Sequence, residues 1–225
     1  MSGIKAVVFD AGGTLVRTAR PVGEIYAEAG RRHGQEWDGD ELQRSFRAAF
    51  KKMRGNRISP VPVNGDDRDW WREVVRHTLG GKAAAVAFED YFEELYRLFE
   101  RPEVWQVFSE VPSVLEELRR AGYRLAVLSN WDSRLRLMFE GLGLARHFEA
   151  LFISTEHGFE KPDAGFYQRA QKALGISPAE ILMVGDDPEN DEAAPRRAGW
   201  QAILVRRPQE TLANALDFLN RGPRN

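Results

Sequence analysis

The sequence predicts an α/β protein: a doubly wound parallel sheet with an all-helical segment inserted after its first strand. From residue 105 onward, short apolar stretches alternate with amphipathic helical patterns, which is typical of βαβ units. Another apolar stretch lies at residues 4–9, and a long segment with helical periodicity separates it from the others. We therefore expect residues 1–16 and 104–225 to form the α/β core and residues 17–103 to form a helical domain.

The first strand leads directly into the helical insertion. It is rich in Val and ends at Asp10, and the Ala11-Gly12-Gly13-Thr14 segment then forms a turn. In the insertion, Asp40 can cap a helix whose apolar face lies within residues 42–53. Two more helices are expected at residues 70–79 and 86–99, with a Pro-rich loop at residues 58–65.

Four further strands and their helices are expected in the second part of the chain. The strands are residues 125–128, 151–153, 181–184 and 202–205, and the helices between them cover residues 112–118, 132–142, 163–174 and a stretch after residue 187. Polar residues follow three of the five strands: Asp10, Ser129-Asn130 and Asp186-Asp187. Because the carboxyl ends of parallel strands meet at one edge of a sheet, these residues should lie together.

Composition excludes several classes of function. Lys and Arg number 32 and Asp and Glu 34, so the net charge of −2 offers no basic field for a nucleic-acid backbone. With no cysteine, the chain has no disulfide, no thiolate chemistry and no Cys-based metal site. No apolar run approaches the ~20 residues of a membrane span or the roughly 7–15 of a signal peptide. We expect a cytoplasmic protein, monomeric or homodimeric, that binds neither nucleic acid nor membrane.

The residues at the predicted strand ends suggest phosphoryl-transfer chemistry. Asp10 and Asp186 would offer hard oxygen ligands of the kind that Mg²⁺ prefers. Lys161, in the loop after the third strand, and Ser129 would add positive charge and a hydroxyl group, as an anion-binding pocket requires. An aspartate in such a pocket can act as a nucleophile toward phosphorus. A strand-end aspartate can instead merely cap a turn, but four fitting elements in order make coincidence improbable.

These segments resemble the motifs of the haloacid dehalogenase-like (HAD) hydrolase superfamily. The matching segments are VVFDAGGTL (residues 7–15), VLSN (127–130), KPD (161–163) and VGDDPEND (184–191). The resemblance extends over the whole chain, because one subfamily carries a helical cap after the first motif. It implies a Rossmann-like core, a cap that closes over the strand ends, and Mg²⁺-dependent hydrolysis of a small phosphorylated metabolite.

The resemblance also implies roles for individual residues. Asp10 would form an aspartyl-phosphate, and Thr14 would hydrogen-bond near this nucleophile. Asp10, the main-chain carbonyl of Gly12 and Asp186 would hold Mg²⁺. The phosphoryl oxygens would be bound by Ser129, the main-chain N–H of Asn130, and Lys161. Asp191 would orient Lys161 or a metal-bound water, and Asp187 would either support the metal site or cap the following helix.

Gly12 departs from the pattern of most phosphatases in this superfamily. They carry a second aspartate at this position, which serves as general acid and then general base, a function typically worth ~10²–10⁴-fold in rate. The chain resembles the branch that lacks this residue. Three hypotheses follow: a weak or selective phosphatase, a phosphonate or haloacid hydrolase, or a non-catalytic phosphate- or partner-binding protein. A phosphonate hydrolase would need a cap lysine as a Schiff base, for which Lys51 and Lys52 are the candidates.

Overall fold

A computed structural model describes residues 3–55 and 61–221, which divide into two compact units. The α/β unit contains residues 3–17, 61–65 and 107–221, and the helical unit contains residues 18–55 and 66–106. Residues 61–65, which the sequence pattern assigned to the helical insertion, are thus part of the α/β unit. The reason is local: the N–H of Gly65 donates to the carbonyl of Thr155 (3.1 Å), and the N–H of Ser133 donates to the carbonyl of Gly65 (2.9 Å).

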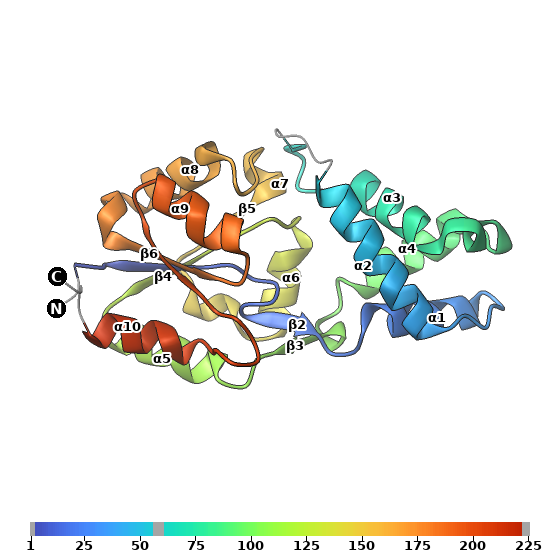
Figure 1. Cartoon of the computed structure of the whole chain (residues 1–225), viewed down its shortest axis with the longest axis horizontal. Coiled ribbons are helices and arrows are strands. Elements are labelled where there is room, and N and C mark those ends of the chain that lie inside the picture. The colour runs from blue at the N-terminus through green and yellow to red at the C-terminus, as the bar shows by residue number, and fades with distance from the viewer. Residues whose placement is uncertain (1–2, 56–60, 222–225) are drawn as a thin grey trace. The chain divides into compact units, whose positions relative to one another are not determined.

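The α/β unit is built on a parallel sheet of five strands in the order β5-β4-β1-β6-β7 (Figure 1). The strands are β1 (Ala6–Phe9), β4 (Arg124–Ser129), β5 (Ala150–Ile153), β6 (Ile181–Gly185) and β7 (Gln201–Leu204). In the centre of the sheet, Phe9 of β1 is in register with Val127 of β4 and Val184 of β6. The three strands therefore end nearly level with one another. The predicted doubly wound parallel α/β fold is confirmed.

Helices cover both faces of this sheet. One face carries α8 (Ala164–Leu174) and α9 (Ala194–Arg197), and the other carries α5 (Val111–Arg120) and α10 (Ala213–Arg221) (Figure 1). Because side chains alternate along a strand, Val8 of β1 packs in the apolar cluster that includes Phe166 of α8, whereas Val7 and Phe9 point to the opposite face. The unit also contains α6 (Arg134–Gly141), α7 (Ser154–His157), η3 (Ala145–His147), η4 (Pro178–Glu180) and the π-helical η5 (Pro188–Ala193).

The helical unit has an apolar core of its own. It contains α1 (Val22–Arg32), α2 (Gly39–Gly55), α3 (Arg68–Leu79), η1 (Gly80–Ala85), α4 (Phe88–Leu98) and η2 (Pro102–Val104). Tyr26, Leu42, Val75 and Phe92, one from each α-helix, are all buried in it. The sequence pattern did not predict α1. Its contact with α2 is close, since a Cβ at Gly23 would lie 2.1 Å from the carbonyl oxygen of Gly39.

Two local features differ from the expectations. The carboxylate of Asp38 accepts the N–H of Glu41 (2.7 Å), so Asp38 caps α2 in place of the expected Asp40. In addition, β2 (Val16–Thr18) and β3 (Trp105–Val107) pair in a separate two-stranded sheet. Strands of three residues are too short for an alternating pattern to show in the sequence.

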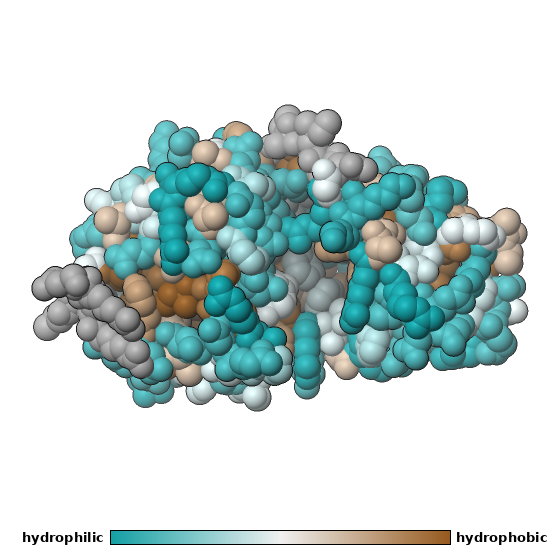
Figure 2. All heavy atoms as spheres, in the orientation of Figure 1, coloured by the Kyte–Doolittle hydropathy of each residue, from teal (hydrophilic) through white to brown (hydrophobic). Residues whose placement is uncertain are grey.

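The visible face of the molecule is mainly hydrophilic (Figure 2). Within residues 3–55 and 61–221, the large apolar side chains with high exposure are those of Val63 (69%) and Leu137 (58%). Throughout this part of the chain, no helix combines the length and the apolar character needed to cross a membrane.

Candidate active site

Three carboxylates converge at the carboxyl edge of the sheet. Asp10 follows β1, Asp186 follows β6, and Asp191 lies in η5, the segment after β6. Each offers an oxygen atom that lies within 4.8 Å of those of the other two. The level ends of β1 and β6 bring the first two together, and the N–H of Asp10 donates to the carbonyl of Val184 (2.9 Å). The expected meeting of strand-end carboxylates therefore occurs.

Lys161 links two of these carboxylates. Its Nζ lies 2.7 Å from Oδ1 of Asp10 and 2.6 Å from Oδ1 of Asp191. The lysine and Asp191 side chains are almost fully buried, with 2% and 1% exposure, whereas Asp10 retains 13%. Asp10 is therefore the member of this ion-pair network that a solute can reach. If the buried ammonium group moved away from either carboxylate, it would leave a buried charge unpaired. The two partners therefore hold it in one position.

Asp186 lies at the solvent-exposed side of the cluster. Its Oδ1 accepts a hydrogen bond from the hydroxyl of Thr14 (3.2 Å), a residue with no exposed surface. Gly13 passes very close to it: its φ is +78°, and a Cβ there would lie 2.4 Å from Oδ2 of Asp186. Glycine at position 13 is required both by the backbone conformation and by this approach. The hydroxyl of Thr14 thus positions Asp186, whereas the resemblance implied a hydrogen bond near the nucleophile.

The charges of the cluster perturb one another. Partial desolvation, together with the nearby carboxylates of Asp10 and Asp191, raises the pKa of Asp186 to about 7. Burial raises the pKa of Asp191, and the ammonium group of Lys161 opposes that rise. For Lys161, burial alone favours the neutral amine, but the two carboxylates outweigh it and raise its pKa. Three carboxylates around one lysine leave an excess of negative charge, which favours a bound cation.

The loop after β4 holds both the nucleophile candidate and the lysine. The hydroxyl of Ser129 donates to Oδ1 of Asp10 (3.1 Å). The side-chain amide of Asn130 makes two hydrogen bonds with the backbone of Lys161: it donates to the carbonyl (2.8 Å) and accepts from the N–H (2.7 Å). The Asn130 side chain therefore fixes the loop that carries Lys161, a function that the motif alone did not reveal.

Asp187 and Asp191 stabilise the π-helical segment η5. Oδ1 of Asp187 accepts the N–H groups of Glu189 (3.0 Å) and Asn190 (2.9 Å), so this carboxylate caps the segment. The N–H of Asp187 in turn donates to Oδ2 of Asp191 (3.0 Å). Both carboxylate oxygens of Asp191 are thus engaged, one by Lys161 and one by the backbone. Asp191 is therefore suited to positioning Lys161, and Asp187 to holding Asp191 in place.

Gly12 lies against the indole ring of Trp131. A Cβ at position 12 would be 3.2 Å from Cζ3 and 3.9 Å from Cη2 of this ring. Trp131 directly follows Asn130, and its backbone is fixed by the buried Ser154: the N–H of Trp131 donates to the Ser154 hydroxyl (3.0 Å), which donates to the Trp131 carbonyl (2.8 Å). The next residue, Asp132, accepts the N–H of Arg134 (3.1 Å) at the start of α6 and also pairs with the Arg134 guanidinium group.

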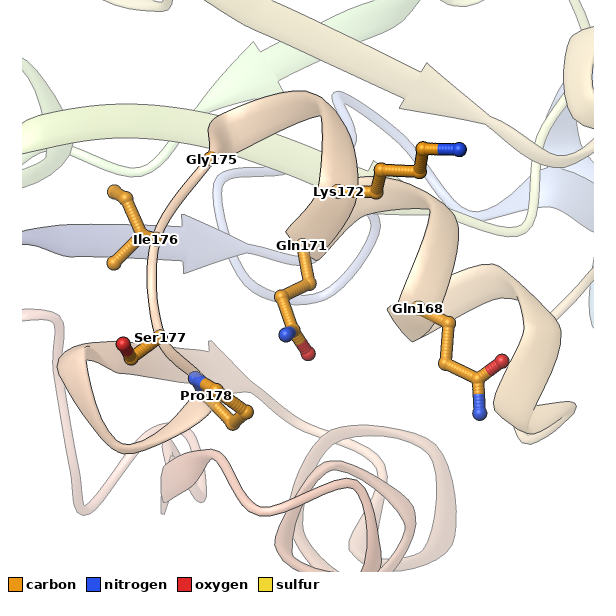
Figure 3. A pocket seen from close by; sticks show the side chains of 7 residues that line it. All are labelled: Gln168, Gln171, Lys172, Gly175, Ile176, Ser177 and Pro178. Carbon is orange, nitrogen blue, oxygen red and sulfur yellow. The ribbon is translucent and has the colours of Figure 1, made fainter.

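A pocket of about 490 Å³ lies away from the carboxylates (Figure 3). It is formed by the C-terminal half of α8 and the loop that leads into η4, and its lining consists of Gln168, Gln171, Lys172, Gly175, Ile176, Ser177 and Pro178. This loop precedes the start of β6, whereas Asp186 follows its end. The pocket is therefore at the opposite edge of the sheet and has no part in the carboxylate site.

Comparison with known proteins assigns the family. The profile of the haloacid dehalogenase-like hydrolase family matches residues 4–199. The chain belongs to this family. Haloacid dehalogenase-like hydrolase domain-containing protein 3 from Homo sapiens is 36% identical over 209 residues, which cover 92% of this chain and 83% of that protein. Phosphoserine phosphatase from Thermus thermophilus is 39% identical over 139 residues, which cover 61% of this chain and 53% of that protein.

The fold of this haloacid dehalogenase-like hydrolase also matches solved structures. The HAD-hydrolase YfnB from Bacillus subtilis, solved bound to magnesium, superposes with a TM-score of 0.78 at 14% identity, over 96% of this chain and 99% of that one. At this identity the likeness concerns the fold alone. The predicted membership of the superfamily is confirmed by the profile match and by the human relative.

Arg207 supports the turn after β1 in this haloacid dehalogenase-like hydrolase, although no sequence pattern predicted that role. Its guanidinium group donates to the carbonyl of Thr14 (2.8 Å), pairs with Glu110 (2.7 Å) and stacks on the ring of Phe108 at 3.5 Å from the centroid. Through Thr14, whose hydroxyl binds Asp186, Arg207 holds the turn after β1 in place. No motif marks this arginine, because its partners are more than ninety residues away in the chain.

Proposed function

We propose that this haloacid dehalogenase-like hydrolase is a Mg²⁺-dependent phosphatase that acts on a small phosphorylated metabolite through Asp10. The observation that carries the proposal is the geometry of Asp10: a partly accessible carboxylate within 2.7 Å of a buried lysine and beside two further carboxylates. A nucleophile, a cation-binding oxygen cluster and a fixed positive charge are the parts that phosphoryl transfer requires.

The donor set suits a hard divalent cation. Asp10, Asp186 and the main-chain carbonyl of Gly12 would hold Mg²⁺, since Asp191 is already engaged by Lys161 and by the Asp187 N–H. The ion would neutralise charge on the phosphoryl oxygens. The raised pKa of Asp186 fits this assignment, because burial and then the nearby carboxylates of Asp10 and Asp191 disfavour its charge, which a bound cation would offset.

The chain's own residues would perform the substitution. In the described part of the chain, both hydrogen bonds to the Asp10 carboxylate fall on Oδ1, which leaves Oδ2 to attack phosphorus. Lys161, held by Asn130 and Asp191, would present its ammonium group to the phosphoryl oxygens and hold the Asp10 carboxylate in one orientation. Ser129 would contribute a hydroxyl donor on the same side. An aspartyl-phosphate forms at Asp10 and is then hydrolysed by water.

Two further arguments support this class of reaction. The Thermus thermophilus relative is named for the hydrolysis of phosphoserine, a small phosphorylated metabolite, although the match spans about half of its length. The phosphonate alternative needs a buried lysine amine, whereas Lys51 and Lys52 are exposed on α2. We also propose that the helical unit acts as the cap and supplies contacts to the substrate.

The decisive assay is hydrolysis of p-nitrophenyl phosphate with 5 mM Mg²⁺ or with EDTA, using rapid mixing to detect a burst. We expect metal-dependent turnover, a burst of nitrophenol equal to the enzyme concentration, and the loss of both in Asp10→Asn. Asp69→Asn is the matched control, because this side chain is 97% exposed on α3. If Asp10→Asn retains metal-dependent turnover, Asp10 is not the nucleophile. If the wild type neither turns over nor forms a phospho-enzyme, haloacids and carbonyl phosphonates become the substrates to test.

A further inference from the structure

We propose that Trp131 fills the place where a general acid would stand at position 12, and thereby restricts the enzyme to acyl and aryl phosphates. This inference rests on the proposed function and names the substrate class of the same site. It begins with the contact between Gly12 and Trp131, in which a Cβ on Gly12 would lie 3.2 Å from the indole ring.

The backbone does not require glycine at position 12. Gly13, its neighbour, has a φ of +78°, but Gly12 is not among the residues with positive φ. An L-amino acid could therefore adopt the backbone conformation of Gly12, and what opposes a side chain is the ring of Trp131. A Cβ at 3.2 Å would force the ring to move slightly away, and an aspartate adds three more heavy atoms beyond that Cβ. The absence of an acid at this position is thus coupled to the presence of the indole.

The backbone of Trp131 is anchored, so the ring can move away from Gly12 only by rotation about its side-chain torsions. Ser154 makes reciprocal hydrogen bonds with the N–H and the carbonyl of Trp131, and the N–H of Thr155 also donates to that carbonyl (3.3 Å). Both anchoring residues are buried, with 1% and 0% exposure. The residue before Trp131 is Asn130, which fixes Lys161. A shift of the Trp131 backbone would therefore disturb the loop that carries the phosphate-binding candidates.

The lack of an acid at position 12 sets the chemistry of both steps, the formation and the hydrolysis of the aspartyl-phosphate. In the first, an oxygen of Asp10 forms a bond to phosphorus while the bond to the leaving oxygen breaks, and the leaving group departs with the electron pair. No acid at position 12 protonates it, so the leaving group must be stable as an anion. In the second, water adds to phosphorus, the bond to Asp10 breaks, and both protons of the water remain on the released phosphate. Atoms and charge balance without a further reactant.

Acyl and aryl phosphates meet the condition set by the first step. Their leaving groups are a carboxylate, whose acid has a pKa of about 4, and a phenolate, whose acid has a pKa of about 10. An alkyl phosphate would release an alkoxide, a far stronger base, and would lose the ~10²–10⁴-fold assistance that a general acid gives. The indole also offers an apolar aromatic surface against which a planar leaving group can pack.

The steric contact between Gly12 and Trp131 is tested without an activity assay, by comparing the melting temperatures of single and double variants. In the wild-type background, we expect Gly12→Ala to lower Tm by about 3 °C or more, because it overpacks the contact with the ring. In a Trp131→Ala background, the same substitution should leave Tm unchanged or slightly raised, because alanine restricts the unfolded chain. Trp131→Leu provides a second background if Trp131→Ala folds poorly. Equal effects of Gly12→Ala in all backgrounds would overturn the coupling.

The selectivity is tested with acetyl phosphate, p-nitrophenyl phosphate and glycerol 3-phosphate in the presence of Mg²⁺. For the wild type, kcat/KM should favour the first two by about 10²-fold or more over the alkyl ester. Gly12→Asp alone should raise activity on glycerol 3-phosphate less than about 10-fold, and Gly12→Asp combined with Trp131→Ala should raise it about 10²-fold or more. Equal wild-type rates on all three, or a full gain in the single variant, would refute the proposal.

The two proposals fail in different ways. If none of the three phosphates is hydrolysed and Asp10 is never phosphorylated, the proposed function is wrong, and substrate selection falls with it even if the melting temperatures are coupled. If phosphatase activity depends on Asp10 but shows no preference among leaving groups, the proposed function stands and only the role of Trp131 is overturned.

Discussion

Replacing Asp186 by asparagine should stabilise the metal-free protein while abolishing its response to Mg²⁺. The carboxylate of Asp186 lies near those of Asp10 and Asp191. Among residues 3–55 and 61–221, Lys161 pairs with these other two carboxylates, and Asp186 forms no ion pair. Asparagine has nearly the same shape and can still accept the hydrogen bond from the Thr14 hydroxyl. The substitution therefore removes a repulsive charge and preserves the local structure.

The expected change in the free energy of unfolding on Asp186→Asn follows from the pKa of Asp186. A rise from 3.8 to about 7 corresponds to about 4 kcal/mol at about 1.4 kcal/mol per pH unit. Because this carboxylate reaches solvent, screening reduces the cost, and we expect Asp186→Asn to add about 1–2 kcal/mol to the free energy of unfolding. For a protein of this size, that is about 2–8 °C in Tm.

The stabilisation expected for Asp186→Asn depends on pH. Because the folded state binds the Asp186 proton more tightly than the unfolded state, the charged carboxylate destabilises the fold at high pH. The advantage of Asp186→Asn should be complete above about pH 7, shrink as the pH falls, and vanish below 3.8, where the carboxyl is protonated in both the folded and the unfolded state. Calorimetry in EDTA at pH 8 and pH 5 measures this difference. With Mg²⁺ at about 100 times its Kd, the wild type alone should gain about 2.7 kcal/mol.

Asp187→Asn is the matched control, since it changes the neighbouring carboxylate. Asp187 accepts two backbone N–H groups, and asparagine caps a helix about as well as aspartate, so Asp187→Asn should leave Tm in EDTA nearly unchanged. A lower Tm for Asp186→Asn in EDTA at pH 8, or an equal response of this variant and the wild type to Mg²⁺, would contradict the assignment of Asp186 to a cation site.

Three other substitutions test the supporting contacts. Lys161→Met leaves buried carboxylates uncompensated, so urea unfolding at pH 7 should show a loss of about 3–5 kcal/mol that lessens at lower pH as Asp191 becomes protonated. Asn130→Ala removes two hydrogen bonds to the Lys161 backbone and should cost about 1–3 kcal/mol, with kcat reduced more than KM is raised; unchanged kcat would refute a positioning role. Arg207→Met should cost about 1–3 kcal/mol, and much of this should return in a double variant with Glu110→Gln; strict additivity would show that the pair is not coupled.

The sequence was informative about the site wherever a motif lies at the end of a strand. Strands β1 and β6 are short and wholly apolar, so their ends could be located from sequence alone, and parallel pairing then placed Asp10 and Asp186 together. Lys161 and Asp191 could be anticipated because the resemblance fixes them relative to the same strands. The two side chains form an ion pair at 2.6 Å, and that Asp191 orients the lysine for catalysis stays a prediction.

Contacts between distant segments escaped the sequence. Arg207 reaches Thr14 across 193 positions, and Gly65 returns from the helical segment to hydrogen-bond with Thr155. The first turn of α2 is capped by Asp38 although Asp40 has the same side chain, because the entry of the chain decides which carboxylate faces the free N–H groups. Such choices depend on packing that no local pattern encodes.

The sequence by itself determined the fold class, the family and the order of the chemical groups along the sheet edge, because these depend on periodicity and on motifs of adjacent residues. It also showed that position 12 lacks an acid. Only the tertiary structure shows what lies beside it: Gly12 is next to Trp131, a residue 119 positions away, and a Cβ would come within 3.2 Å of the ring. Exclusion of one side chain by another is a property of packed atoms in three dimensions, and it becomes visible only when the two loops are placed side by side.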